Sequence, residues 1–215
     1  MKTLIAVPSM DMVPARFAQS LSMLQKDGDE QCMVAFQIGS LVYNARNSLA
    51  TIAVQQECDR VLWLDSDMVF SSDVLGTLAY TMKETKADIV SGLYFRRVPP
   101  YSPVIYKRLE ETPDHTAEFE EYKELPEERV FDIAGCGFGC VLMGTDVILS
   151  VHEKFHDMFT PTPGMGEDLA FCYRARQCGY RIVCNQDVKL GHVGFDVINK
   201  GFYDAYRQRK QGQSE

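Results

Sequence analysis

The sequence feature that most constrains the fold of this chain is one apolar run that is followed directly by two aspartates. Residues 61–64 are Val-Leu-Trp-Leu, and Asp65, Ser66 and Asp67 follow directly. Large apolar residues in a row, β-branched and aromatic among them, are typical of a strand buried on both faces. Side chains two positions apart in extended backbone project to the same side, so we expect Asp65 and Asp67 to offer oxygens to one small volume. Such carboxylates repel each other unless a cation lies between them, which predicts a divalent cation with a phosphate-bearing ligand.

The first half of the chain alternates short apolar runs with segments of helical periodicity. Strands are expected at residues 3–7, 32–36, 61–64 and 89–90, with helices between them. Such alternation predicts an α/β fold with a mainly parallel sheet and helices on both faces, in which ligands bind beyond the carboxyl ends of the strands. Asp65 and Asp67 stand at such an end.

The second half is less regular. Residues 98–128 are rich in proline and acidic residues, which predicts long loops or an excursion with short strands. A glycine-rich turn at 135–139 would either line an acceptor site or simply join two strands. Helices are expected at 145–156 and 167–178, and short strands then lead to His192.

Composition and charge narrow the class of protein. The 215 residues are 46% hydrophobic and 24% charged, which fits one domain with a buried core. A formal charge of -8 argues against broad binding to nucleic acid or an anionic membrane. The seven cysteines have no paired framework, and no segment reads as a signal peptide or membrane span, so we expect reduced thiols and a cytoplasmic location.

Three motifs in order resemble one enzyme family. A strand ending in Asp-x-Asp is followed about a hundred residues later by Gly-Glu-Asp at a helix start, and then by Gly-His. Over residues 2–194 the sequence resembles the nucleotide-diphospho-sugar glycosyltransferases of the GT-A fold, family-2-like members with an Asp-x-Asp motif in particular. The resemblance implies metal-dependent transfer of a sugar from a nucleotide-diphosphate donor, such as a UDP- or GDP-sugar, to a hydroxyl acceptor. It also divides the chain into a nucleotide-binding half at about 1–95 and an acceptor and catalytic half at about 130–195.

The same resemblance assigns the central roles. Asp67 and His192 would bind Mn²⁺ or Mg²⁺, and Asp65 would lie against the ribose or a metal-bound water, or bind the metal itself. Asp168 would take the proton from the acceptor hydroxyl in an inverting reaction, and Glu167 would contact the acceptor. Some retaining members have a similar Gly-His-Val segment, so a retaining reaction is the alternative.

The acids at 167 and 168 also have a simpler explanation. Acidic residues at a helix N-terminus complement the helix dipole, which is common and of modest energetic value. A helix N-terminus should also depress the pKa of Asp168, so that the carboxylate would be ionised at neutral pH but weakly basic.

Further nucleotide contacts are expected where the first strand ends and beside the Asp-x-Asp motif. An arginine at position 46 would either pair with a phosphate or point outward from an amphipathic helix. The residues expected to bind the nucleotide are Pro8, Ser9, Asp11, Arg46, Asp65, Ser66 and Asp67.

Three other functions fit parts of the sequence. Asp65 and Asp67 match the nucleophile motif of haloacid dehalogenase-like phosphohydrolases, which form an aspartyl phosphate. His152, Glu153 and His156 match H-E-x-x-H, the helical signature of zinc peptidases. A nucleotide-sugar-binding subunit without turnover is the third alternative. Residues 196–215 are expected to form a tail or helix that is simply exposed to solvent, contacts a membrane surface or a partner protein, or closes over the donor as a lid.

Overall fold

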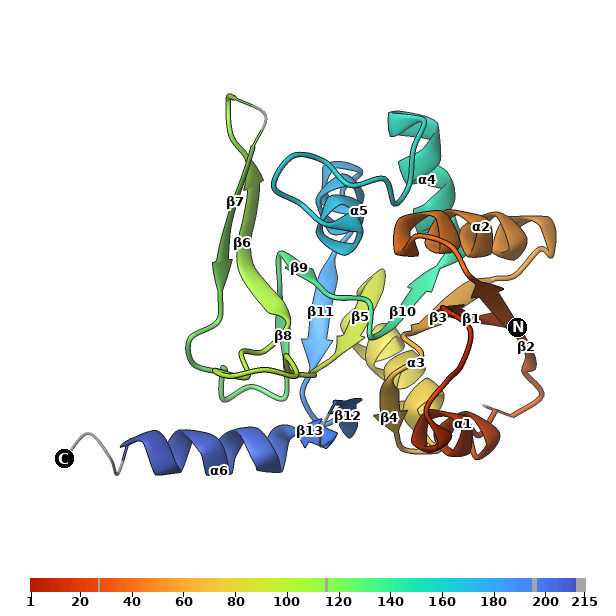
Figure 1. Cartoon of the computed structure of the whole chain (residues 1–215). Helices are drawn as coiled ribbons and strands as arrows, with labels where there is room; N and C mark the ends of the chain where they lie inside the picture. The colour runs from red at the N-terminus through yellow and green to blue at the C-terminus, as the bar shows by residue number, and fades with distance from the viewer. Residues whose placement is uncertain (27, 115, 195–196, 212–215) are drawn as a thin grey trace.

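The computed structural model describes residues 1–26, 28–114, 116–194 and 197–211. A mixed sheet of seven strands forms its centre (Figure 1). In spatial order the strands are β2 (Gln31–Ile38), β1 (Lys2–Ser9), β3 (Arg60–Leu64), β10 (Cys140–Gly144), β5 (Ile89–Gly92), β11 (Ile182–Asn185) and β8 (Val130–Asp132).

The sheet is less parallel than the sequence predicts. β1 pairs in parallel with β2 and β3, and β11 with β5, as expected for an alternating chain. However, β10 lies antiparallel between β3 and β5, and β8 is antiparallel at the edge. The insertion of β10 brings the turn before this strand against the end of β3. There the Asp65 N–H donates to the Gly139 carbonyl at 3.1 Å.

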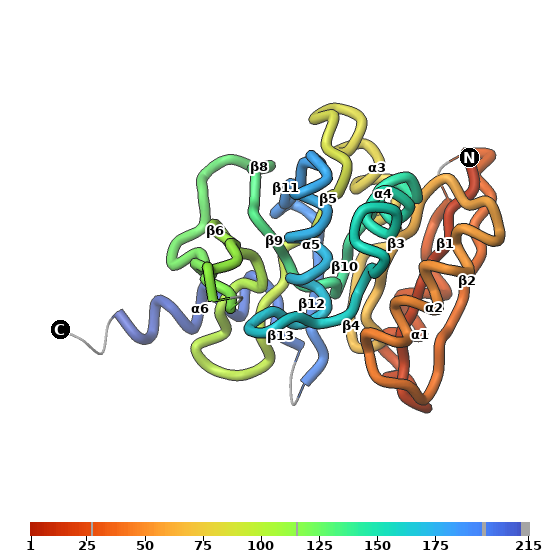
Figure 2. The backbone as a smooth tube through the Cα atoms, turned by 90° about the horizontal axis from the view of Figure 1, so that it is seen from above, coloured from red at the N-terminus to blue at the C-terminus, as the bar shows by residue number. Residues whose placement is uncertain are grey.

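Helices cover both faces of the sheet, as predicted. α2 (Val42–Gln55), α4 (Thr145–Phe155) and α5 (Glu167–Gln177) lie side by side over one face (Figures 1 and 2), and α1 (Ala15–Ser22) and α3 (Val74–Thr85) cover the other. β3 shows the consequence directly, since Val61 and Trp63 join the core under α2, whereas Leu62 and Leu64 join the core with α3. The strand is therefore buried on both faces.

The expected loop region contains a hairpin. β6 (Ile105–Glu111) pairs antiparallel with β7 (Ala117–Glu121) and with the short β9 (Gly135–Cys136). A second small sheet joins β4 (Met68–Phe70), β12 (Leu190–Val193) and β13 (Val197–Asn199), and this places His192 opposite Met68.

The C-terminal segment forms α6 (Lys200–Gln211), and residues 196 and 212–215 of the predicted tail lie outside the described residues. Within the described ranges, no helix combines the length and apolar character that crossing a membrane needs. The contact of this segment with a membrane or a partner stays a prediction.

Candidate active site

The Asp-x-Asp motif forms a turn between β3 and β4, not the extended backbone that we expected. The Met68 N–H donates to the Asp65 carbonyl at 3.1 Å and closes the turn. As a result the two carboxylates face different cations. Asp65 Oδ1 lies 2.8 Å from Arg46 Nη2, whereas Asp67 Oδ2 lies 2.9 Å from Arg97 Nη1. The two carboxylates line the same cavity although they pair with different arginines, and metal binding by Asp65 stays a prediction.

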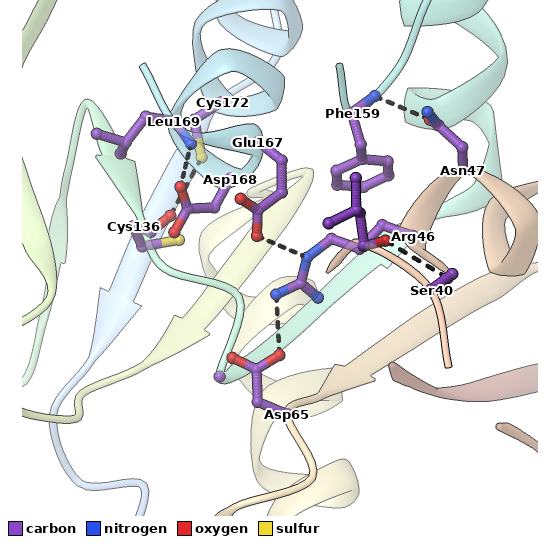
Figure 3. Close-up of polar contacts among 12 residues, drawn as sticks. Ser40, Arg46, Asn47, Asp65, Cys136, Phe159, Glu167, Asp168, Leu169 and Cys172 are labelled. Atoms are coloured by element: carbon purple, nitrogen blue, oxygen red, sulfur yellow. Dashed lines mark hydrogen bonds and ion pairs between the residues drawn. The ribbon is translucent and has the colours of Figure 1, made fainter. Parts of the chain in front are cut away.

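Arg46 connects the two acidic motifs of the chain (Figure 3). It comes from the first turns of α2, and its side chain is only 2% exposed, so the alternative of an outward arginine is wrong. Its Nε lies 3.3 Å from Glu167 Oε1, while Nη2 binds Asp65. The remaining nitrogen, Nη1, is buried and has no hydrogen-bond partner among the described residues, although the guanidinium lies 5.2 Å from the centre of the Phe138 ring. Contact of Arg46 with a phosphate stays a prediction.

His192 faces the second aspartate of the motif. Its Nδ1 lies 2.9 Å from the Phe95 carbonyl oxygen, which can only accept, so Nδ1 must hold the proton that is donated. In the neutral ring Nε2 then has a free lone pair, and this nitrogen lies 3.4 Å from Asp67 Oδ2. Burial raises the pKa of Asp67, but the hydrogen bond and charge that His192 supplies when Nε2 is also protonated, together with the charge of Arg97, outweigh burial and hold that pKa below its usual range.

The pair of Asp67 and His192 fits a divalent cation. Within the described residues, no group of three or more His, Cys, Asp and Glu side chains could hold a metal ion, and Asp67 and His192 are the two candidate ligands that face each other. Neighbouring ligands of an octahedral cation are about 3 Å apart at bond lengths of about 2.1 Å. The 3.4 Å between Oδ2 and Nε2 is close to this separation, and phosphate oxygens and water would complete the shell.

Asp168 begins α5, and its pKa differs from our expectation. Burial, the largest cause, and the charge of Glu167 raise the pKa of this carboxyl to about 6, against the lowering effects of Arg46 and the Leu169 N–H. The expectation of a depressed pKa is therefore wrong, because loss of hydration outweighs the favourable helix N-terminus. Oδ1 accepts from the Leu169 N–H at 2.8 Å, and Oδ2 has no hydrogen bond within the described part of the chain. A carboxylate with such a pKa is a stronger base than an ordinary aspartate.

A raised pKa also predicts a stability effect. On folding, Asp168 takes up a proton between roughly pH 4 and 6, so this group lowers the stability as the pH rises through that window. We expect Asp168→Asn to raise the free energy of unfolding at pH 7.5 by about 1–2 kcal/mol, with partial exposure allowed for. Urea unfolding at several pH values measures the difference, which should vanish below pH 4. A variant that is less stable than the parent at pH 7.5 would contradict the raised pKa.

The glycine-rich turn makes room for a tyrosine ring. A Cβ built on Gly137 would lie 2.0 Å from Tyr94 Oη, and one built on Gly139 would lie 2.8 Å from Tyr94 Cζ. The ring is buried, and its hydroxyl oxygen accepts from the Gly139 N–H at 3.3 Å. The missing side chains at these two positions therefore accommodate Tyr94, which explains them without a bound sugar.

Most of the predicted residues line one cavity of about 330 Å³. Its lining includes nine of them: Pro8, Ser9, Arg46, Asp65, Ser66, Asp67, Glu167, Asp168 and His192. Asp11 is exposed and is not in this lining, so its contact with a nucleotide stays a prediction. Sequence reasoning missed Met10, Ser40 and Val42. Ser40 and Val42 follow the carboxyl end of β2, and the rule that ligands bind at strand ends would have indicated them.

The H-E-x-x-H motif does not form the geometry of a zinc peptidase. α4 ends at Phe155, and His156 has left-handed backbone with a φ of 53°. The His156 N–H still donates to the His152 carbonyl at 2.8 Å, but His156 is the residue that ends the helix, and both side chains are exposed. Within the described residues no group of three or more metal-ligating side chains includes them, so the zinc-peptidase alternative stays a hypothesis without structural support.

Comparisons with known proteins support the fold. No protein-family model and no curated protein matches the sequence. The chain resembles A197 from STIV, with a TM-score of 0.63 and 19% identity over 90% of this chain and 86% of that chain. It also resembles GalNAc-T7 with UDP, GalNAc and Mn²⁺, with a TM-score of 0.59 and 9% identity over 90% of this chain and 44% of that chain. The chain spans less than half of that GT-A glycosyltransferase. At such identities the likeness concerns the fold alone: this is a glycosyltransferase-like α/β fold.

Proposed function

We propose that this protein transfers a sugar from a nucleotide-diphosphate donor to a hydroxyl acceptor, with a divalent cation, Mn²⁺ or Mg²⁺, as cofactor. The strongest support for this proposal is that the residues which the reaction needs line a single cavity. It contains a pair suited to a divalent cation, Asp67 and His192, and a carboxylate with a raised pKa, Asp168. Bound between the pair, the cation would neutralise the charge that develops on the departing diphosphate.

The protein groups then have separable tasks. Asp168 accepts the proton of the acceptor hydroxyl while the hydroxyl oxygen bonds to the anomeric carbon. The bond from that carbon to the diphosphate breaks, and its electron pair leaves with the nucleoside diphosphate. Attack from the face opposite the leaving group inverts the configuration. Glu167 contacts the acceptor, and Arg46 fixes the carboxylate of Glu167 relative to Asp65.

The nucleoside would lie where the first two parallel strands end. Pro8, Ser9 and Met10 follow or end β1, and Ser40 and Val42 follow β2, so these residues form one side of the cavity. We propose that the whole chain acts as one domain, with the nucleotide-binding half at about 1–95 and the acceptor half at about 130–195. These halves meet in this cavity, which takes its acids from both.

Thermal stability with nucleotides tests the proposal first. Melting temperatures are measured with UDP, GDP and their sugars, each with and without Mn²⁺. We expect one nucleoside diphosphate to raise the melting temperature strongly only when Mn²⁺ is present. At a hundredfold excess over its dissociation constant, a ligand of the native state stabilises by about 2.7 kcal/mol, which is easily detected.

A matched variant identifies the site. Asp67→Asn keeps the size of the side chain and removes its charge, so the metal-dependent shift should disappear. Asp187→Asn, an exposed aspartate away from the cavity, should keep the full shift. A shift with a phosphate-mimicking anion and Mg²⁺, but with no nucleotide, would contradict glycosyl transfer and favour the phosphohydrolase. Nucleotide binding without release of diphosphate from any sugar donor would favour the non-catalytic subunit.

A further inference from the structure

Arg97 occupies a position that a bound cation would disturb. Its Nη1 lies 2.9 Å from Asp67 Oδ2, and His192 Nε2 lies 3.4 Å from the same oxygen. A divalent cation between Oδ2 and Nε2 would therefore stand next to a guanidinium. Like charges at such a distance repel each other, although solvent reduces the effect. The present contact and cation binding are in competition.

The backbone of Arg97 is fixed, but its side chain can move. The loop after β5 is closed by the Arg96 N–H, which donates to the Ser102 carbonyl at 2.9 Å, and by the Tyr101 N–H, which donates to the Val98 carbonyl at 2.9 Å. The Arg97 side chain is 50% exposed, and its stem lies over Gly194, which has no side chain to obstruct it. A long exposed arginine changes rotamer on a nanosecond timescale or faster.

Arg97 also lines the cavity in which the donor would bind. A diphosphate bound to the cation beside Asp67 would bring several anionic oxygens within reach of a side chain anchored at this place. A guanidinium binds phosphate oxygens through two parallel hydrogen bonds, which its single contact with one oxygen of the partly buried Asp67 carboxylate does not match. The diphosphate therefore removes the repulsion and offers Arg97 a better partner.

We infer that Arg97 makes binding of the cation depend on binding of the donor diphosphate. In the free protein Arg97 neutralises Asp67 and weakens the site for a cation alone. In the complex the guanidinium turns to the phosphates and stabilises them. This inference rests on the proposed function, since it assigns the same cavity to a nucleoside diphosphate and a divalent cation. Coupling of this kind is reciprocal, so each ligand should strengthen the binding of the other by the same factor.

Titration of Mn²⁺ tests the coupling without any assay of activity. The signal of free Mn²⁺ in electron paramagnetic resonance gives its dissociation constant, without nucleotide and with saturating UDP or GDP. Without nucleotide, we expect Arg97→Ala to bind Mn²⁺ about two- to fivefold more tightly than the parent, as expected for loss of one exposed ion pair. With the nucleoside diphosphate bound, Arg97→Ala should bind Mn²⁺ no more tightly than the parent, or more weakly. The enhancement of Mn²⁺ affinity by the nucleotide is then smaller in the variant.

The neighbouring arginine provides the control. Arg96 is also exposed, but it binds Glu121 and the Tyr106 hydroxyl, so Arg96→Ala should match the parent in every titration. If Arg97→Ala binds Mn²⁺ without nucleotide as tightly as the parent or more weakly, the inference about Arg97 is wrong, but the proposed function is unaffected. If the parent does not bind Mn²⁺ in the presence of UDP or in the presence of GDP, the proposed function is wrong, and the inference is wrong with it.

Discussion

Asp168→Asn is expected to lower the rate of sugar transfer by about 10²- to 10⁴-fold and to leave donor affinity almost unchanged. Asparagine keeps the shape of the side chain and its acceptor oxygen for the Leu169 N–H, but it cannot accept a proton. Release of nucleoside diphosphate from the donor measures the rate, with water as the acceptor where no other is known. Donor affinity comes from the metal-dependent thermal shift.

The pH dependence of the parent rate follows from the same carboxyl. A base must be ionised to accept a proton, and the pKa of Asp168 is raised to about 6. The rate should therefore be half-maximal near pH 6, fall tenfold with each further unit of decreasing pH, and be level above about pH 7. Asp168→Asn should lose this limb of the profile. An ordinary aspartate would place the midpoint near pH 4 instead.

A second acid at a helix start separates catalysis from helix electrostatics. Asp146 lies in the first turn of α4, is exposed, and is not in the lining of the cavity. If acids at helix starts only complement the dipole, Asp146→Asn and Asp168→Asn should behave alike. We expect Asp146→Asn to keep the rate of the parent. Equal rates in Asp168→Asn and the parent would remove the assignment of the base.

The fold follows from local patterns in the sequence, apart from one strand. Apolar runs and helical periodicity predict most elements of the sheet and both helical layers, since these patterns reflect burial directly. The antiparallel position of β10 is different. Its apolar run reads the same whichever direction it takes and whichever strands it joins, and only tertiary packing between β3 and β5 decides this.

The site was predictable as a set of residues but not as a set of contacts. Strand ends and a helix start share one edge of an α/β sheet, which explains why nine predicted residues line the cavity. Sequence spacing does not reveal that residues 65–67 turn, nor that Arg46 is buried between Asp65 and Glu167. Nor does the sequence reveal that loss of hydration raises the pKa of Asp168, because this loss depends on every residue that packs around the carboxyl.

Arg46→Met is expected to lower the free energy of unfolding by about 2–4 kcal/mol at pH 7.5. Methionine fills much of the same volume beside Trp63 and Phe138, but it leaves Asp65 and Glu167 without their cation. Removal of one partner from a buried ion pair is strongly destabilising, and the partial exposure of the two acids reduces the loss here. Urea unfolding measures it. Addition of Glu167→Gln to Arg46→Met should recover part of the loss, since it removes one of the uncompensated charges.

The pH profile distinguishes a positioning role of Arg46 from a purely structural one. Arg46 lowers the pKa of Asp168, so its loss should move the midpoint of the rate above pH 6. Arg60 serves as the matched control, because it forms a buried ion pair with Glu30 at 2.7 Å and begins β3, whereas Asp65 follows the end of that strand. Arg60→Met should also destabilise the protein but leave the midpoint in place. If both variants keep the midpoint of the parent, Arg46 stabilises the fold without tuning Asp168.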